Sequence, residues 1–124
     1  MSGNNDWVKK EILPELKDKS QAKITSYYCR RLKTIHENFA HVFVCEIKNE
    51  NDLIINWSNI VNLVAVYVQS EVESLLQRSN FYIWFFCEDE ISQHIQKSIE
   101  DDTFSSKKYI VVEKDKKASR KELG

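Results

Sequence analysis

The pattern of apolar positions centres on residues 80–87, which have the sequence NFYIWFFC. Seven of these eight residues are apolar or aromatic, polar residues precede the run, and three acidic residues at 88–90 follow it. A short apolar run with such boundaries is typical of a strand that is covered on both faces. We therefore predict that residues 80–87 form a central strand with helices above and below it.

The segments on either side of this run predict a second strand and two helices. Residues 41–48, with the sequence HVFVCEIK, alternate between two sets of mostly apolar side chains and predict a strand. Residues 53–77 contain no glycine or proline and repeat apolar residues every three or four positions, so they predict a long helix. Ile91, Ile95 and Ile99 are spaced by four and predict a short helix after the central strand.

The end of the chain predicts a last strand and a tail. Residues 108–113 are rich in β-branched residues and predict a strand, and Phe104 is expected to fill the turn before it. Residues 100–102 form an acidic run at the unfavourable end of a helix dipole, and we expect a solvated turn there. Residues 114–124 have no apolar periodicity and predict a flexible basic tail, which leaves residues 1–113 as a single α/β domain.

The order of these elements predicts the fold class. From residue 41 onward, strands and helices alternate, which favours crossover connections and parallel strands. We predict an α/β (α+β) fold: a small three- to four-stranded, largely parallel sheet with a long helix and a short helix packed on it. Residues 24–35 fit a helix or a strand, and their tyrosines favour a strand that adds an antiparallel edge. Residues 7–16 predict either two short helical turns or a helix that begins near Pro14.

Composition and charge remove several classes of function. The chain has 124 residues with 18 basic and 19 acidic side chains, so no global field attracts it to nucleic acid or to acidic membranes. Its two glycines, Gly3 and Gly124, lie at the ends, which excludes a glycine-rich nucleotide loop. The N-terminus does not resemble a signal peptide, and no run approaches the roughly 18 apolar residues of a membrane helix. We expect a cytoplasmic protein.

The sharpest candidate for enzymatic chemistry is the pair Glu46 and Lys48. A carboxylate and an ammonium two residues apart at a strand end occur in metal-dependent nucleases, where the acid binds the metal and the lysine assists the attacking water. Such a site needs a second acid upstream, and no Asp or Glu lies between Asp18 and Glu37. A minimal nuclease-like domain therefore remains an alternative, and a solvent-exposed ion pair is the favoured interpretation.

The histidines and cysteines do not form a recognisable site. His36, His41 and His94 and the three cysteines lack the spacings of known metal motifs, so we expect core thiols and surface imidazoles rather than a metal site. A nucleophilic pair of Cys87 with His94 is not favoured, because geometry rather than composition decides such pairs. We expect no catalytic residues, no metal and no cofactor.

The predicted long helix has more apolar surface than one small sheet can cover. Trp57, Val66 and Tyr67 point to sides outside the main stripe, and spare apolar surface on a small domain is typical of a partner interface. Coverage by the first helix is an equally good explanation. A third possibility is a plain homodimeric small domain that buries this helix against its own copy.

Residues 80–112 carry a family resemblance. The aromatic strand at 80–86 is followed by the acidic residues 88–90, and then by a helix that leads into IEDDTFSSKKYIV at 99–111. This region resembles the middle component of bacterial ABC three-component conflict systems, with Lys107 at a position where arginine is at least as typical. The order of elements from residue 41 is also similar, whereas the first forty residues add nothing to the match.

The resemblance implies a non-enzymatic adaptor that links an SMC/ABC-type ATPase to an effector, often a nuclease, in defence against phages or plasmids. Such an adaptor would contact nucleic acid only indirectly, through the complex. The family offers no catalytic residue or cofactor to carry over. By analogy, Glu100, Asp102, Phe104, Lys107 and Lys108 shape the loop before the last strand, for structure or for a partner contact. Together with the apolar surface of the long helix, this gives the residues expected to bind a partner: Trp57, Tyr67, Phe104, Lys107 and Lys108.

Overall fold

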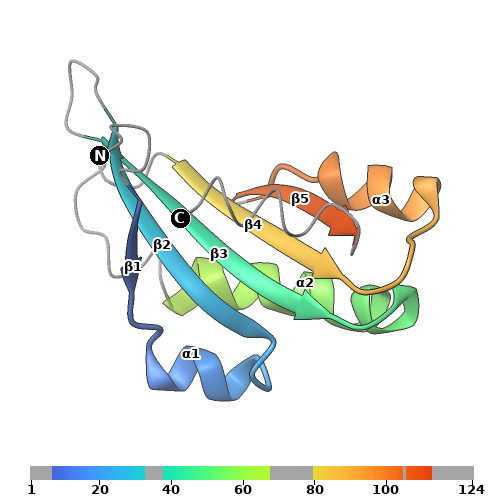
Figure 1. The fold of residues 1–124 in the computed structure, drawn as a ribbon, viewed down its shortest axis with the longest axis horizontal. Coiled ribbons are helices and arrows are strands. Elements are labelled where there is room, and N and C mark those ends of the chain that lie inside the picture. Colours follow the sequence, from blue (N-terminus) through green and yellow to red (C-terminus); the bar gives the residue numbers. More distant parts are fainter. Residues whose placement is uncertain (1–6, 33–37, 68–79, 105, 113–124) are drawn as a thin grey trace.

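Five strands form one sheet in the computed structural model, which describes residues 7–32, 38–67, 80–104 and 106–112 (Figure 1). The elements follow one another as β1 (Val8–Lys10), α1 (Pro14–Lys19), β2 (Ile24–Leu32), β3 (Asn38–Ile47), α2 (Glu50–Tyr67), β4 (Asn80–Cys87), α3 (Gln93–Glu100) and β5 (Lys107–Val112). The spatial order of the strands is β1-β2-β3-β4-β5, the same as their order in the chain.

The sheet is mixed, which corrects the predicted three- to four-stranded, largely parallel sheet. β3, β4 and β5 are parallel neighbours, and α2 and α3 lie in the two connections between them, as parallel pairing requires. β1, β2 and β3 are antiparallel neighbours. The predicted strand at 24–35 is confirmed for Ile24–Leu32 and is antiparallel, but β1 lies outside it and forms the edge.

The N-terminal region contains a strand that the sequence did not predict. Val8–Lys10 pairs with Tyr27, Tyr28 and Cys29 of β2, and the first helix begins only at Pro14. Proline suits the first turn of a helix because its missing N–H has no partner there in any helix. A helix that ran through Pro14 would lose a hydrogen bond, so the chain before it is available for pairing with the sheet.

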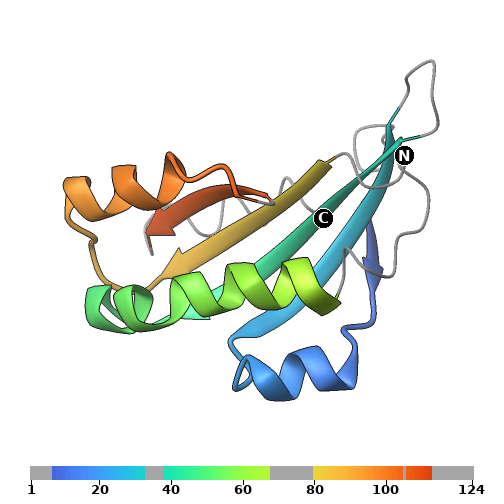
Figure 2. The ribbon, with the colours of Figure 1, turned by 180° about the vertical axis from the view of Figure 1, so that it is seen from behind.

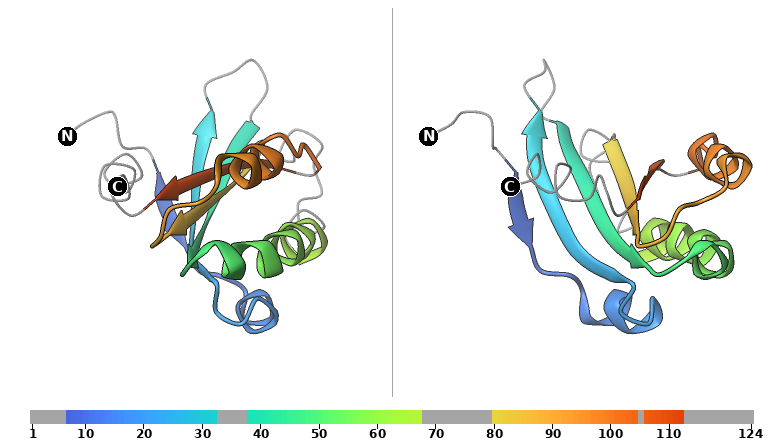
Figure 3. Two further views of the ribbon diagram at one scale, coloured as in Figure 1. Left: turned by 90° about the vertical axis from the view of Figure 1, so that its right-hand side faces the viewer. Right: turned by 45° about the vertical axis from the view of Figure 1, so that its right-hand side comes forward.

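The three helices lie on one face of the sheet (Figures 2 and 3). Odd-numbered residues of β3 and β4 point to this face, because side chains alternate along a strand. They form the main core with residues of the helices: Leu16, Ile24, Phe43, Cys45, Ile47, Leu53, Ile60, Val61, Val64, Phe81, Ile83, Phe85, Cys87, Ile91, Ile99 and Ile110. The expectation that helices cover both faces of the central strand is therefore wrong for the described residues.

The opposite face of the sheet carries a smaller, aromatic cluster. Val42, Val44 and Phe86 are buried there. Five partly buried side chains pack against them: Trp7, Tyr28, Tyr82, Trp84 and Val111. The aromatic run at 80–87 thus supplies rings to both faces of the sheet, and this explains why it reads as a strand covered on both sides.

The helix boundaries follow local hydrogen bonds. α2 begins at Glu50, three residues before the prediction, because the Asn49 Oδ1 atom accepts the Asp52 N–H at 2.8 Å and caps the first turn. The start of α3 is tied to α2, since the Ser92 N–H donates to Glu50 Oε1 at 2.6 Å. Predicted helix residues 68–77, strand residues 33–35 and the tail at 114–124 lie outside the described residues. Within the described part of the chain, no helix is long and apolar enough to cross a membrane.

Candidate partner-binding loop between α3 and β5

The loop between α3 and β5 is built around a buried lysine. Lys108 is the second residue of β5, and its side chain is fully buried. It points to the helix side of the sheet together with Ile110, because residues two apart on a strand share a face. An ammonium group removed from water must have hydrogen-bond partners and a counter-charge.

The loop itself supplies the partners of Lys108. Its Nζ atom donates to the carbonyl oxygens of Phe104 and Ser106, each at 2.6 Å, and of Asp102 at 3.2 Å. The carboxylate of Asp102 lies 3.1 Å from the same nitrogen and provides the negative charge. One ammonium group therefore holds the backbone at Asp102, Phe104 and Ser106.

The two acidic side chains that precede Asp102 make different contacts. Glu100 Oε2 accepts the N–H of Ile110 at 2.9 Å and so joins the last turn of α3 to β5. Asp101 forms an exposed ion pair with Lys97 at 3.0 Å. The acidic run at 100–102 was expected to be a solvated turn, and for Glu100 and Asp102 this is wrong. Glu100 accepts a hydrogen bond from the β5 backbone, and Asp102 pairs with the β5 residue Lys108. The signal in the sequence was the pairing of an acidic run with Lys108 across a short loop.

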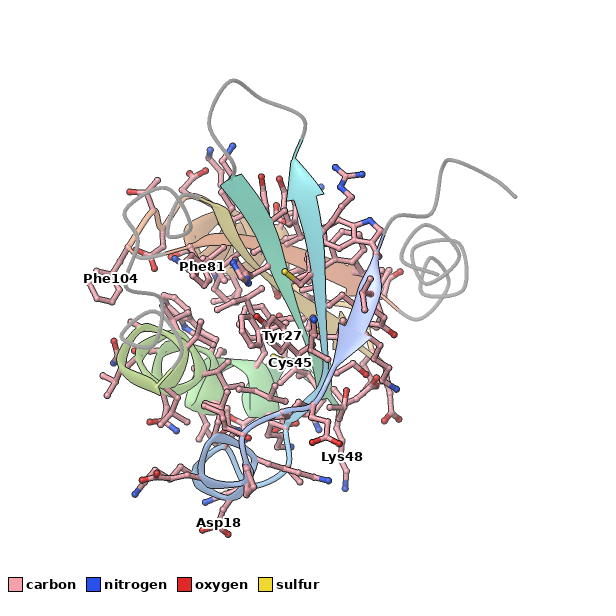
Figure 4. All side chains as sticks on the ribbon, turned by 90° about the vertical axis from the view of Figure 1, so that its left-hand side faces the viewer. Asp18, Tyr27, Cys45, Lys48, Phe81 and Phe104 are labelled. Atoms are coloured by element: carbon pink, nitrogen blue, oxygen red, sulfur yellow. The ribbon has the colours of Figure 1, made fainter. Side chains whose placement is uncertain are left out.

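Phe104 is exposed at the tip of this loop. Its side chain is 57% exposed, so the prediction that it fills the turn before the last strand is wrong. Figure 4 shows the ring projecting outward. The reason is that Lys108 occupies the inner side of the loop and binds the backbone carbonyl of Phe104 itself, which leaves the ring outside. A large apolar side chain is thus held in solvent by a fixed backbone.

The other residues predicted for partner binding lie elsewhere. Lys107 is exposed on the opposite face of the sheet from Lys108, as the alternation of β5 requires. Trp57 is partly buried and packs against the main core. Tyr67 is the last described residue of α2, and only its backbone is described. The structure therefore joins Phe104 and Lys108 through a hydrogen bond, while Lys107 and Trp57 point elsewhere.

The outer face of α2 is uncharged and exposes two large apolar side chains. Ile55 is 66% exposed and Val66 is 59% exposed, and the 11-residue spacing between them puts both on one side of the helix. Asn59 and Asn62 lie between them and are also exposed. No charged residue occurs from 53 to 70, in a chain that is 30% charged. α1 packs beside α2 but leaves these apolar side chains in solvent.

Glu46 and Lys48 are not part of a metal site in the described chain. Glu46 is partly buried near the end of β3, and Lys48 is exposed just after it. The nearby acid, Asp52, accepts the Lys48 N–H at 2.9 Å and pairs with the Lys23 ammonium at 2.8 Å. Burial opposes ionisation of Asp52, but these hydrogen bonds outweigh it and lower the pKa of its carboxyl. Among residues with a described position, no three His, Cys, Asp or Glu side chains gather to hold a metal ion.

Three of the five histidine and cysteine residues with a described position are buried, and His36 lies outside the described residues. Cys45 and Cys87 are buried thiols outside any disulfide, and burial raises the pKa of Cys45, so it stays protonated and weakly nucleophilic. His94 is exposed on α3, whereas Cys87 is buried, so the two are not arranged as a nucleophile and its base. His41 was expected at the surface, but it is buried and its Nδ1 atom lies 2.8 Å from the Tyr27 hydroxyl.

Comparison with known proteins gives one match. The family model for the ABC-three component (ABC-3C) system Middle Component 1 matches residues 41–123, which is more than half of the chain. The match begins in β3 and includes the Lys108 loop, while β1, α1 and β2 precede it. No curated protein and no solved structure matches the chain.

Proposed function

This chain belongs to the Middle Component 1 family of ABC-three component systems, and from that membership we propose that it is a non-enzymatic adaptor. In this proposal, it links an SMC/ABC-type ATPase to an effector of the nuclease type in a complex that acts against phages or plasmids. A middle component implies partner proteins on either side. The chain must then present surfaces that bind them.

The observation that carries the proposal is the exposed ring of Phe104 on a loop with a fixed backbone. Aromatic residues that insert into a partner contribute a large share of the binding energy at interfaces. Binding is stronger when the side chain is already held in place, because less conformational entropy is lost on association. The four contacts of Lys108 Nζ with the loop provide that order before any partner arrives.

A second surface suits a second partner. The outer face of α2 exposes Ile55 and Val66 and carries no charge, and depletion of charge is typical of the centre of protein interfaces. In the proposal, Trp57 and Tyr67 belong to this helix as support or contact. The alternative of a nuclease using Glu46 and Lys48 has no observation in its favour among the described residues.

Affinity purification of the tagged full chain from its host tests the proposal. Bound proteins would be identified by mass spectrometry after a high-salt wash, because salt removes weak charge contacts and leaves apolar interfaces. We expect a large ATPase and a second protein to remain. Phe104→Ala should lose one of the two by tenfold or more, since truncation of an anchor residue costs about 2 kcal/mol or more.

The matched control is Leu13→Ala. Leu13 is also a large exposed apolar residue, but it precedes α1 near the opposite edge of the sheet. We expect this variant to retain both partners. Recovery of the protein alone, or only with copies of itself, would contradict the adaptor role. Equal partner recovery with Phe104→Ala and Leu13→Ala would contradict the role of the loop and leave the adaptor role to the α2 face.

A further inference from the structure

The face of the sheet opposite the helices combines aromatic rings with basic side chains. No described helix covers it, as the right-hand view of Figure 3 shows. Residues that face one another in paired strands lie on the same side of a sheet, so the register assigns the side chains of this face. We call it the aromatic face and define it by Trp7, Lys9, Tyr28, Arg30, Glu46, Tyr82, Trp84, Phe86, Lys107 and Tyr109.

The rings of β4 and β5 form a contiguous group on this face. The ring centroids of Tyr82 and Tyr109 lie 6.3 Å apart with nearly parallel planes, and those of Trp84 and Tyr109 lie 6.0 Å apart edge to face. Tyr109 is 40% exposed, and Tyr82 and Trp84 are partly exposed. Tyr82 and Trp84 are two residues apart, about 6.6 Å along the strand, so each ring can take a different base of an extended strand.

The charges of the aromatic face are mostly positive. Lys107 lies directly across from Tyr82, and Lys9 lies directly across from Tyr28. The guanidinium of Arg30 lies 4.8 Å from the centre of the Trp7 ring. Glu46 is the one acidic side chain among the residues that define the face. A surface hollow of about 460 Å³ adjoins Lys9 at the β1 edge, and its other charged residues, Lys10, Glu11 and Lys17, are not part of the aromatic face.

We propose that the aromatic face binds single-stranded nucleic acid directly. Bases would stack on Tyr82, Trp84 and Tyr109, and phosphates would contact Lys107, Lys9 and Arg30. Aromatic rings beside positive charges, on a face that no described helix covers, fit this polyanion better than an acidic peptide, because an acidic peptide does not present a row of planar bases to the rings. The proposal goes beyond the adaptor role and replaces the sequence-based expectation that nucleic acid is contacted only through the complex.

Fluorescence anisotropy of labelled oligonucleotides tests the proposal with the full chain. Single-stranded DNA and RNA of about 12 nucleotides would be titrated at several salt concentrations. We expect binding that weakens with salt for at least one of the two. Tyr109→Ala should weaken it by about tenfold, because one base loses its stacking partner, and Tyr109→Phe should restore it. Lys107→Gln should lower the slope of log K against log salt by about 0.7, the value for one phosphate contact.

Two controls lie off the aromatic face. Phe104→Ala removes another exposed ring, and Lys97→Gln removes an exposed charge on α3, so neither should change the affinity. Absence of binding to both oligonucleotides at low salt would overturn the proposal. Equal affinity of Tyr109→Ala and the intact chain would also overturn it. Polyglutamate would also be added as a competitor at equal charge concentration. If it displaced the oligonucleotide, and Tyr109→Ala did not change the affinity, the face would instead be assigned to an acidic protein.

Discussion

Lys107 and Lys108 are neighbours in β5, yet they lie in opposite environments. Lys108 is buried on the helix side, where Asp102 and three loop carbonyls bind its ammonium. Lys107 is exposed on the aromatic face, across from Tyr82. Two further side chains show the same contrast. The Tyr27 hydroxyl on the helix side lies 2.8 Å from His41 Nδ1, whereas Lys9 is exposed on the aromatic face, across from Tyr28.

The largest loss of stability is expected for Lys108→Met, on the helix side of the sheet. The substitution keeps the apolar stem but leaves Asp102 and the loop carbonyls without their cation. Asp102 is 30% exposed and can be partly solvated in the variant, so we expect a loss of about 1 to 3 kcal/mol, as for charged hydrogen-bonding groups that lose a partner. Urea denaturation of the variant should show this loss in the free energy of unfolding. A change below about 1 kcal/mol would mean that the loop does not depend on the lysine.

A smaller effect is expected for Asp52→Asn, at the junction of β3 and α2. The variant loses the ion pair with Lys23 and a charged acceptor for the Lys48 N–H, so we expect a loss of about 1 to 2 kcal/mol at neutral pH. The pKa of Asp52 is lowered on folding, so its contribution is present above the pKa of an unfolded Asp and disappears as the pH falls through the folded value. The difference in unfolding free energy between the variant and the wild type should therefore be smaller at acidic pH than at neutral pH, as measured by urea denaturation. The same difference at both pH values would contradict this.

Tyr27→Phe tests the helix side at alkaline pH. Burial, with a smaller effect of Cys29, raises the pKa of Tyr27 from 10.0 to about 12. The unfolded chain releases this proton first, so the tyrosine makes stability fall as the pH rises through that window. Between pH 10.0 and about pH 12, the unfolding free energy of the variant should fall less than that of the wild type. Parallel curves of unfolding free energy against pH would show that Tyr27 ionises normally.

The smallest effect on stability is expected for Lys107→Gln. Its side chain is exposed, and substitutions at exposed positions usually change the free energy of unfolding by less than about 0.5 kcal/mol. The variant should unfold at the same urea concentration as the wild type, in contrast to the substitution at the next residue. A loss comparable to that of Lys108→Met would remove the distinction between the two faces.

The strands and helices with strong local patterns could be predicted from the sequence. The central strand at 80–87 has the predicted boundaries, and β3, β5 and the beginning of α2 lie within three residues of the prediction. β1 could not be predicted, because Val8–Lys10 is three residues long, exposed throughout, and defined by its pairing with β2. Such pairing depends on contacts between distant residues and leaves no local periodicity.

The loop between α3 and β5 could be located from the sequence, but its contacts could not. The loop residues Phe104 and Lys108 were identified, yet hydropathy assigns Phe to the interior and Lys to the surface, and the structure has the reverse. The burial of Lys108 depends on a carboxylate and backbone carbonyls that only the folded loop assembles. The alternation of side chains in β5 could have indicated it, because Lys108 is two residues from the buried Ile110 and so lies on the same face of the sheet.

The central claim is that Lys108 holds the loop and that the ring of Phe104 is free to bind a partner. The most direct test is the free energy of unfolding of Phe104→Ala, measured by urea denaturation beside the wild type. The account predicts a change within about 0.5 kcal/mol, as for an exposed side chain. A loss of about 3 kcal/mol or more, as for a phenylalanine in a core, would contradict it and return Phe104 to the role of filling the turn.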